Sequence, residues 1–277
     1  MSQSRRDFFK IGAMGIAAAG SLSGIARNAK AQSKNDELPL GIASYTFRKF
    51  SLDETIEMTR QMGVKNIALK SMHMPLDAST SEIKAAATKV RDAGLNLYGA
   101  GVIYMKSEAD VNQAFDYAQA AELKVIIGVP NHELLQLVEK KVKETDIIVA
   151  IHNHGPGDDL YPSPESIYEK VKDLDKRIGI CMDIGHTQRI KLDPSEQAEK
   201  YRDRLHDVHI KDVSWASAKG TTVEIGRGVI DIPEFIETLR KIEYDGMVSL
   251  EYEKDADNPL CGAAESIGYT RGVMAAL

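Results

Sequence analysis

The stretch Val171–His186, VKDLDKRIGICMDIGH, determines how the rest of the chain is interpreted. It reads as the end of a helix, a charged turn, the apolar strand Ile178–Met182, and then Asp183 and His186. A short apolar run bounded by turn signals is typical of a strand buried on both faces of a parallel sheet. A carboxylate directly after such a strand needs water, a partner or a metal ion, because burying an unpaired charge is unfavourable.

The same pattern recurs three times in the second half of the chain. Each time an apolar strand ends in His, Asp or Glu: IIVAIHNH (Ile147–His154), LHDVHIKD (Leu205–Asp212) and MVSLEYE (Met247–Glu253). Four such endings in one half of a chain are hard to attribute to chance.

Strand and helix patterns alternate along the whole chain after residue 40. Capping boxes such as Ser51–Glu54 and Ser79–Glu82 open two of the helices, and proline follows the caps Ser163 and Asp193. This alternation predicts parallel βαβ units, and eight units in about 240 residues fit a single α/β domain, a closed (β/α)8 TIM barrel. A doubly wound open sheet is the alternative, but no G-x-G-x-x-G follows the first strand and no Walker loop occurs. The predicted strands are 40–48, 66–70, 96–105, 124–129, 147–151, 178–182, 207–210 and 246–250.

The first residues resemble a twin-arginine export signal rather than part of the fold. SRRDFFK (Ser4–Lys10) is followed by the apolar run Ile11–Ile25 and by Ala29-Lys30-Ala31, an A-x-A cleavage pattern. The apolar run is too short and too glycine-rich for a stable membrane span. We therefore expect a periplasmic protein, with a signal peptide at 1–31, a lead-in at 32–39 and the barrel at 40–277.

Composition excludes several classes of function. The 277 residues carry a formal net charge of −6 and no basic stripe, which argues against nucleic acid as a partner. Two cysteines, Cys181 and Cys261, make neither a disulfide framework nor a cysteine-rich zinc site. Cys181 lies within a predicted strand, and we expect it to be a small buried apolar residue.

In a (β/α)8 barrel the carboxyl ends of the strands form one mouth, where active sites lie. Residues i and i+2 of a strand share a side, so each strand ending can place a pair of polar groups there. Mixed His, Asp and Glu ligands suit one divalent ion such as Zn, Mn, Co or Mg. We expect His73, His132 and His206 to be structural. The residues at the predicted mouth are Lys70, His152, His154, Asp183, His186, His209, Lys211, Glu251 and Glu253.

Four motifs resemble the xylose-isomerase-like barrel superfamily, also called the sugar phosphate isomerase/epimerase family. They are CMDIGHT (Cys181–Thr187), DVHIKD (Asp207–Asp212), EIGRGVIDIPEFIETL (Glu224–Leu239) and YDGMVSLEYE (Tyr244–Glu253). The resemblance covers residues 40–277 and implies that Asp183, His209 and Glu251 are metal ligands.

At the fifth strand this sequence departs from the family pattern. Many members have a ligating glutamate there, followed two residues later by histidine, whereas this chain has His152 and then His154. Either His152 replaces the glutamate as the fourth ligand, or the metal keeps three protein ligands and His152 contacts substrate.

The resemblance also implies roles for the other polar residues at the mouth. His154, His186, Lys211 and Glu253 are the candidate catalytic groups, and Lys211 could steady an oxyanion or act as an acid or base. Lys70 and Arg227 are candidates for holding substrate oxygens.

Such a site supports proton abstraction next to a carbonyl, with the metal stabilising the resulting enolate. With the export signal, this favours a metal-dependent enzyme acting on a keto-sugar or 3-keto-glycoside, with elimination (a lyase) preferred over isomerisation or epimerisation. An endonuclease IV-like phosphodiesterase and a non-catalytic sugar-binding barrel are less favoured. The expected partner is a small carbohydrate, and a homo-oligomer is left open.

Overall fold

The structure is a computed structural model that describes residues 38–277. The predicted signal peptide at 1–31 and most of the lead-in at 32–39 lie outside the described residues. Within residues 38–277, each helix is too short or too polar to cross a lipid bilayer.

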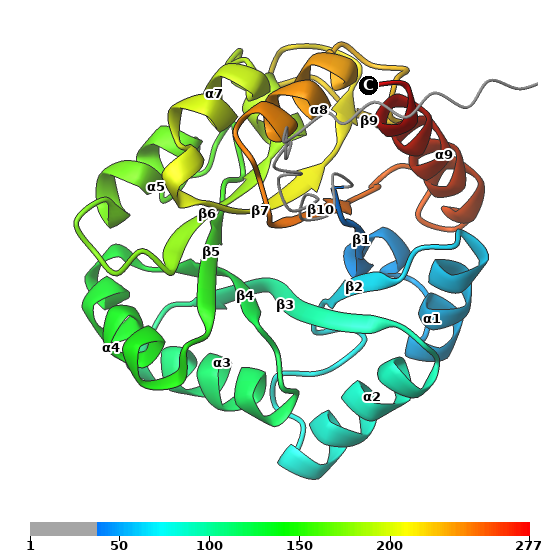
Figure 1. The fold of residues 1–277 in the computed structure, drawn as a ribbon. Helices are drawn as coiled ribbons and strands as arrows, with labels where there is room; N and C mark the ends of the chain where they lie inside the picture. The colour runs from blue at the N-terminus through cyan, green and yellow to red at the C-terminus, as the bar shows by residue number, and fades with distance from the viewer. Residues whose placement is uncertain (1–37) are drawn as a thin grey trace, which may run out of the picture. The chain divides into compact units, whose positions relative to one another are not determined.

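The strands form a closed parallel barrel in the order β1-β10-β7-β6-β5-β4-β3-β2, with helices around it (Figure 1). The predicted (β/α)8 TIM barrel is therefore confirmed. Its strands are β1 Leu40–Ala43, β2 Asn66–Leu69, β3 Asn96–Met105, β4 Val125–Pro130, β5 Ile148–His152, β6 Ile178–Asp183, β7 Leu205–Ile210 and β10 Met247–Leu250.

The helices begin largely where the caps predict. Both predicted capping boxes are present, with Ser51 accepting from Glu54 N–H and Ser79 accepting from Glu82 N–H. Ser163 and Asp193 cap helices that begin with proline. The helices are α1 Leu52–Gln61, α2 Thr80–Asp92, α3 Glu108–Ala120, α4 Leu135–Thr145, α5 Pro164–Val171, α6 Ile184–Arg189, α7 Pro194–Lys200, α8 Ile232–Lys241 and α9 Leu260–Ala276.

The first strand is shorter than the predicted 40–48. It ends at Ala43 and continues as a 3-10 helix, Ser44–Phe47. Two buried hydroxyls take the place of sheet hydrogen bonds here: Ser44 Oγ accepts from Lys70 N–H at 2.8 Å, and Thr46 Oγ1 donates to Leu250 O at 3.1 Å. These contacts turn the chain away from the barrel at the level of its mouth.

Two buried clusters form the core. A large cluster contains residues of both strands and helices, such as Phe235 and Leu239 of α8, and fills the layer between the barrel and its helices. A small cluster consists of strand residues alone, including Tyr98, Ile127 and Cys181, and fills the interior of the barrel.

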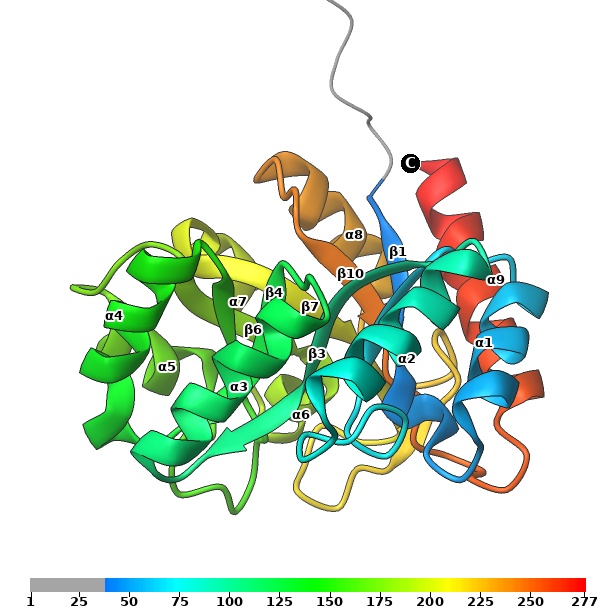
Figure 2. The same cartoon turned by 90° about the horizontal axis from the view of Figure 1, so that it is seen from below.

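The loops that follow the strands gather at one end of the barrel, the lower side in Figure 2. The longest lies after β7 and contains a two-stranded antiparallel pair that was not predicted, β8 Asp212–Val213 and β9 Thr222–Val223. Asp212 is buried and its carboxylate accepts from Val213, Gly226, Gly228 and Ile230 N–H, at 2.8 to 3.3 Å. One carboxylate thus holds this long loop against the barrel mouth.

Candidate metal centre and active site

Four predicted ligands converge inside the barrel mouth. The ligand atoms of His152, Asp183, His209 and Glu251 all lie within 4.8 Å of one another, and all four residues are buried. His152 Nε2 lies 3.2 Å from His209 Nδ1 and 3.6 Å from Asp183 Oδ2, and His209 Nδ1 lies 3.5 Å from Glu251 Oε2. Four neighbouring strand ends therefore point one donor atom each at a common centre.

These distances fit a divalent ion. An ion with ligand bonds of about 2.0–2.2 Å holds neighbouring ligand atoms about 3.0–3.5 Å apart. Asp183 Oδ2 is buried, and the groups close to it are charged or metal-binding side chains: Lys211 Nζ at 2.9 Å and His152 Nε2 at 3.6 Å. Two imidazoles and two carboxylates match Zn, Mn or Co in donor chemistry. The geometry therefore groups His152 with the other three candidate ligands, the arrangement that the first of the two sequence alternatives predicts.

The protonation states of His152 and of the two carboxylates suit ligation, whereas His209, whose pKa Glu251 raises despite burial, would give up a proton when an ion binds. Burial lowers the pKa of His152 to about 3, so its imidazole is neutral and free to donate a lone pair. Burial alone would raise the pKa of Asp183, but its interactions with His186 and Lys211 outweigh burial and hold that pKa low. Lys211 and His209 likewise hold the pKa of Glu251 well below its usual value despite burial.

Lys211 lies directly against this centre. Its Nζ is 2.9 Å from Asp183 Oδ2, 2.8 Å from Glu251 Oε2 and 2.9 Å from Glu253 Oε1, and the residue is 1% exposed. Burial disfavours the ammonium, but the three carboxylates outweigh it and raise the pKa of Lys211 well above its usual value. Gly185 provides space for this side chain, because a Cβ there would lie 2.8 Å from Lys211 Cγ. These contacts therefore favour the charged, ammonium form of Lys211.

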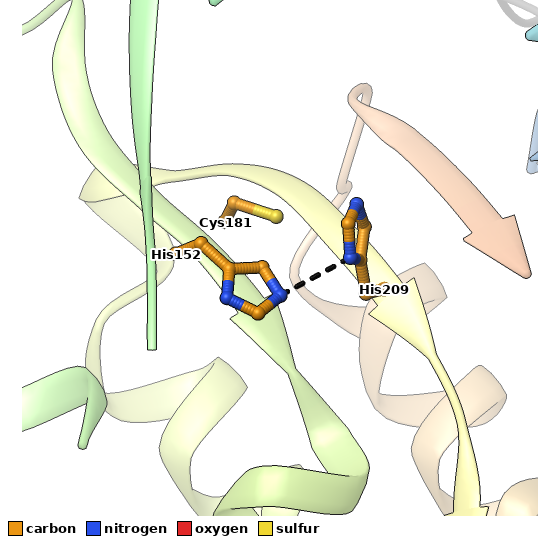
Figure 3. A group of neighbouring side chains, drawn as sticks. All are labelled: His152, Cys181 and His209. Atoms are coloured by element: carbon orange, nitrogen blue, oxygen red, sulfur yellow. Dashed lines mark hydrogen bonds between the residues drawn. The ribbon is translucent and has the colours of Figure 1, made fainter. Parts of the chain in front are cut away.

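Cys181 lies beside the two histidines (Figure 3). Its sulfur and a ring nitrogen of His152 and of His209 all lie within 4.8 Å of one another. The residue is fully buried, as predicted, and its thiol donates a weak hydrogen bond to Asp207 Oδ1 at 3.8 Å. Burial and the charge of Asp207 raise the pKa of the thiol, so it stays protonated when no metal ion binds it.

A cavity of about 460 Å³ opens beside the centre. His186, Lys211 and Glu253 line its floor, and the strand pair β8–β9 forms one wall. Asp183 Oδ1 accepts from His186 N–H at 2.7 Å and so caps α6. Burial lowers the pKa of His186, which leaves a neutral imidazole at the cavity floor.

His154 belongs to a polar chain next to the centre, and its ring centroid lies 4.6 Å from that of His152. Its Nε2 is hydrogen-bonded to Tyr104 Oη at 3.0 Å, and its Nδ1 lies 3.6 Å from Asp158 Oδ2. Sequence reasoning missed Tyr104 and Asp158. Tyr104 is the penultimate residue of β3. The search for polar side chains at strand ends considered His, Asp, Glu and Lys, and the same search would have included Tyr104 if tyrosine had been counted.

The two predicted substrate-binding residues lie in different places. Lys70 faces the mouth, where Nζ donates to Val102 O at 2.8 Å and lies 5.8 Å from the ring centres of Tyr45 and Tyr104. Arg227 is paired with Glu265 of α9 and does not line the cavity, so its predicted contact with substrate finds no support in this geometry.

The three histidines expected to be structural have local partners. His73 is buried and its ring contacts Ser44 Oγ at 2.8 Å and Thr55 Oγ1 at 3.0 Å. His132 Nε2 lies 3.2 Å from Leu160 O, and His206 Nε2 lies 2.7 Å from Lys176 O.

The fold and the converging side chains define a (β/α)8 barrel with a candidate metal centre at its mouth. The family model described as the xylose isomerase-like TIM barrel matches residues 48–273, and the chain belongs to this family.

The named relatives and structural neighbours include a dehydratase and two epimerases. Inosose dehydratase of Histophilus somni is 29% identical over 158 residues, which cover 48% of this chain and 51% of that protein. L-ribulose 3-epimerase has the same fold, with a TM-score of 0.70, 15% identity and coverage of 87% of this chain and 95% of that one. The 3-keto-D-glucoside 4-epimerase of E. coli also has this fold, with a TM-score of 0.68, 18% identity and coverage of 85% of this chain and 100% of that one. The chain matches 33% and 51% of the length of two curated relatives.

Proposed function

We propose that this protein is a divalent-metal-dependent enzyme that removes the proton next to the carbonyl of a keto-sugar or 3-keto-glycoside and then expels the neighbouring substituent. The observation that carries the proposal is the convergence of His152, Asp183, His209 and Glu251 beside a cavity whose floor holds proton-accepting groups. The resemblance to a dehydratase and to sugar epimerases supports the same class of chemistry.

The ion held by these four residues would supply Lewis-acid stabilisation of the negative charge that develops on the substrate carbonyl oxygen. Lys211 would add a positive charge beside the ion, with Glu253 as the carboxylate that remains available to its ammonium when Asp183 and Glu251 bind the ion. His186 and Glu253 line the cavity, and together with His154 they are the candidates for accepting the proton.

Elimination is preferred to epimerisation because of the proton-transfer groups. A two-base epimerase needs a proton acceptor on each face of the substrate, and the family uses the strand-five and strand-eight glutamates for this purpose. Here the strand-five position is His152, which is 1% exposed and directed at the other ligands. A sugar epimerase or isomerase that shares the enolisation step is the second candidate, favoured by the fold shared with 3-keto-D-glucoside 4-epimerase.

A phosphodiesterase of the endonuclease IV type is disfavoured. Such an enzyme needs a three-metal cluster, whereas within residues 38–277 every candidate ligand group includes both His152 and His209. The net charge of −6 also disfavours attraction to DNA.

The deciding experiment is proton NMR of the metal-loaded protein with a 3-keto-glycoside in D2O, beside a chelator-treated sample. Metal-dependent loss of the C2 proton signal with release of the aglycone is the expected result. Exchange without release would identify an epimerase or isomerase instead. Unchanged turnover in Asp183→Ala or Glu251→Ala would refute the metal-centred reaction altogether.

We also propose export by the twin-arginine route, on the basis of Ser4–Lys10 and the A-x-A pattern at residues 29–31. Export in the folded state would let the cell insert the metal before translocation. Replacing Arg5 and Arg6 with Lys is expected to leave the protein in the cytoplasm, as detected by cell fractionation, and normal export of this variant would contradict the proposal.

A further inference from the structure

The ammonium of Lys211 contacts the same two oxygen atoms that the metal centre offers. Asp183 Oδ2 and Glu251 Oε2 belong to the converging ligand set, and Lys211 Nζ lies 2.9 and 2.8 Å from them. Its third contact, Glu253 Oε1 at 2.9 Å, is to a residue outside that set. Lys211 therefore contacts two candidate ligands and one further carboxylate, that of Glu253, which can pair with the ammonium when the other two bind a metal ion.

A divalent ion and this ammonium repel each other in the buried site. An ion bound to these oxygens would lie about 2.0–2.2 Å from each. Because Nζ is held within 3 Å of the same atoms, the two positive charges would stand only a few ångströms apart and out of water, where repulsion is weakly screened.

Charge counting indicates how the site accommodates both cations. Asp183, Glu251 and Glu253 carry three negative charges and Lys211 one positive charge, which leaves −2 beside two histidines. This matches one divalent ion, provided that Lys211 pairs with Glu253 and releases the two ligand oxygens. Glu253 is suited to this role because its side chain is 34% exposed and lies at the cavity floor.

We propose that Lys211 is a tethered competitor for the divalent ion: it occupies the two ligand carboxylates until the ion binds, and Glu253 then receives its ammonium. The pair Lys211–Glu253 thus sets the affinity of the centre. This inference rests on the metal centre of the proposed function but not on the reaction that the enzyme catalyses.

The two residues of the pair are expected to shift metal affinity in opposite directions. Lys211→Met removes the competitor and is expected to tighten Mn²⁺ or Zn²⁺ binding by about 10- to 100-fold, the scale on which groups just outside a ligand set act. Glu253→Gln removes the alternative partner of the ammonium and is expected to weaken binding. Lys70→Met is the matched control, because it removes another ammonium at the mouth whose hydrogen bond goes to Val102 O rather than to a ligand.

The measurement is the dissociation constant of Mn²⁺ and of Zn²⁺ by chelator competition on the full chain, without substrate. A second readout is thermal unfolding: metal-free Lys211→Met is expected to melt at a lower temperature than wild type and to gain more from added metal. Weaker or unchanged binding in Lys211→Met would overturn the inference, because it would mean that the lysine supports the ligands or is indifferent to the ion. Equal tightening in Lys70→Met would overturn it as well, since net charge would then explain the effect. A wild-type protein that binds no divalent ion would overturn the metal centre itself and this inference with it.

Discussion

The buried carboxyl of Asp207 offers a quantitative test of how the barrel interior treats charge. Asp207 precedes His209 by two residues on β7, is fully buried, and leaves its Oδ2 without a hydrogen-bond partner. Burial raises its pKa from 3.8 to about 7, although the charge of His209 offsets part of this. We predict that the change in unfolding free energy caused by Asp207→Asn is more favourable to the folded state at pH 8 than at pH 4.

The sign and size follow from proton linkage. Between about pH 4 and 7 the native state keeps a proton on Asp207 that the unfolded state has lost, so stability falls as the pH rises. A difference of about three pH units at 1.36 kcal/mol each corresponds to about 4 kcal/mol lost by wild type and not by the variant. The amide of the variant carries its own burial penalty, but that penalty does not depend on pH and cancels.

The assay is urea unfolding of both proteins, treated with chelator, at several pH values from 4 to 8. The difference in unfolding free energy between variant and wild type removes the contribution of titrating groups that do not interact with Asp207. It should grow in favour of the variant by about 4 kcal/mol across the range. A difference that stays constant with pH would show that Asp207 titrates normally and would refute the reasoning.

Three further predictions concern the centre and the loop above it. Asp183→Asn is expected to lower turnover by about 10³-fold or more and to abolish tight divalent binding, because a metal ion contributes several kcal/mol to such reactions. Measurements of kcat/KM and equilibrium dialysis test this prediction. Retained metal binding would contradict the ligand assignment. Cys181→Ser is expected to weaken Cd²⁺ binding by about tenfold and to leave Mn²⁺ binding unchanged. The sulfur lies within 4.8 Å of ring nitrogens of His152 and His209, and only the softer Cd²⁺ favours thiolate. Equal effects on the binding of both ions would argue against sulfur ligation. Asp212→Ala is expected to lower the unfolding free energy, measured in urea, by about 2–4 kcal/mol, because four backbone N–H groups lose their acceptor. A decrease below about 1 kcal/mol would mean that water replaces the carboxylate as the acceptor.

The barrel could be predicted from the sequence because its signals are local. Ser51–Glu54 and Ser79–Glu82 act within one helical turn, and the apolar run Ile178–Met182 is complete in five residues. The end of β1 could not be predicted in this way. Ser44 and Thr46 find their partners at Lys70 and Leu250, and nothing near residue 44 in the sequence indicates those contacts.

The ligand set could be predicted for a different reason. A closed parallel barrel brings all strand ends to one mouth, so topology alone makes neighbours of His152, Asp183, His209 and Glu251. The chain Tyr104–His154–Asp158 escaped the same reasoning. Tyr104 lies two strands away from β5, and the contact depends on how far one phenol ring reaches across the end of β4.

The role of Lys211 depends on geometry that no motif specifies. The sequence places it two residues after His209 and allows either a base or a fixed cation. A lysine with no carboxylate neighbour in a dry site loses its proton readily and can act as a base. Three carboxylates within 2.9 Å, contributed by β6 and by the segment that follows β10, instead hold the ammonium in its charged form. The number of anions that converge on the amine therefore decides its charge: the same contacts that favour the ammonium of Lys211 make it a cation that a metal ion must displace from Asp183 and Glu251.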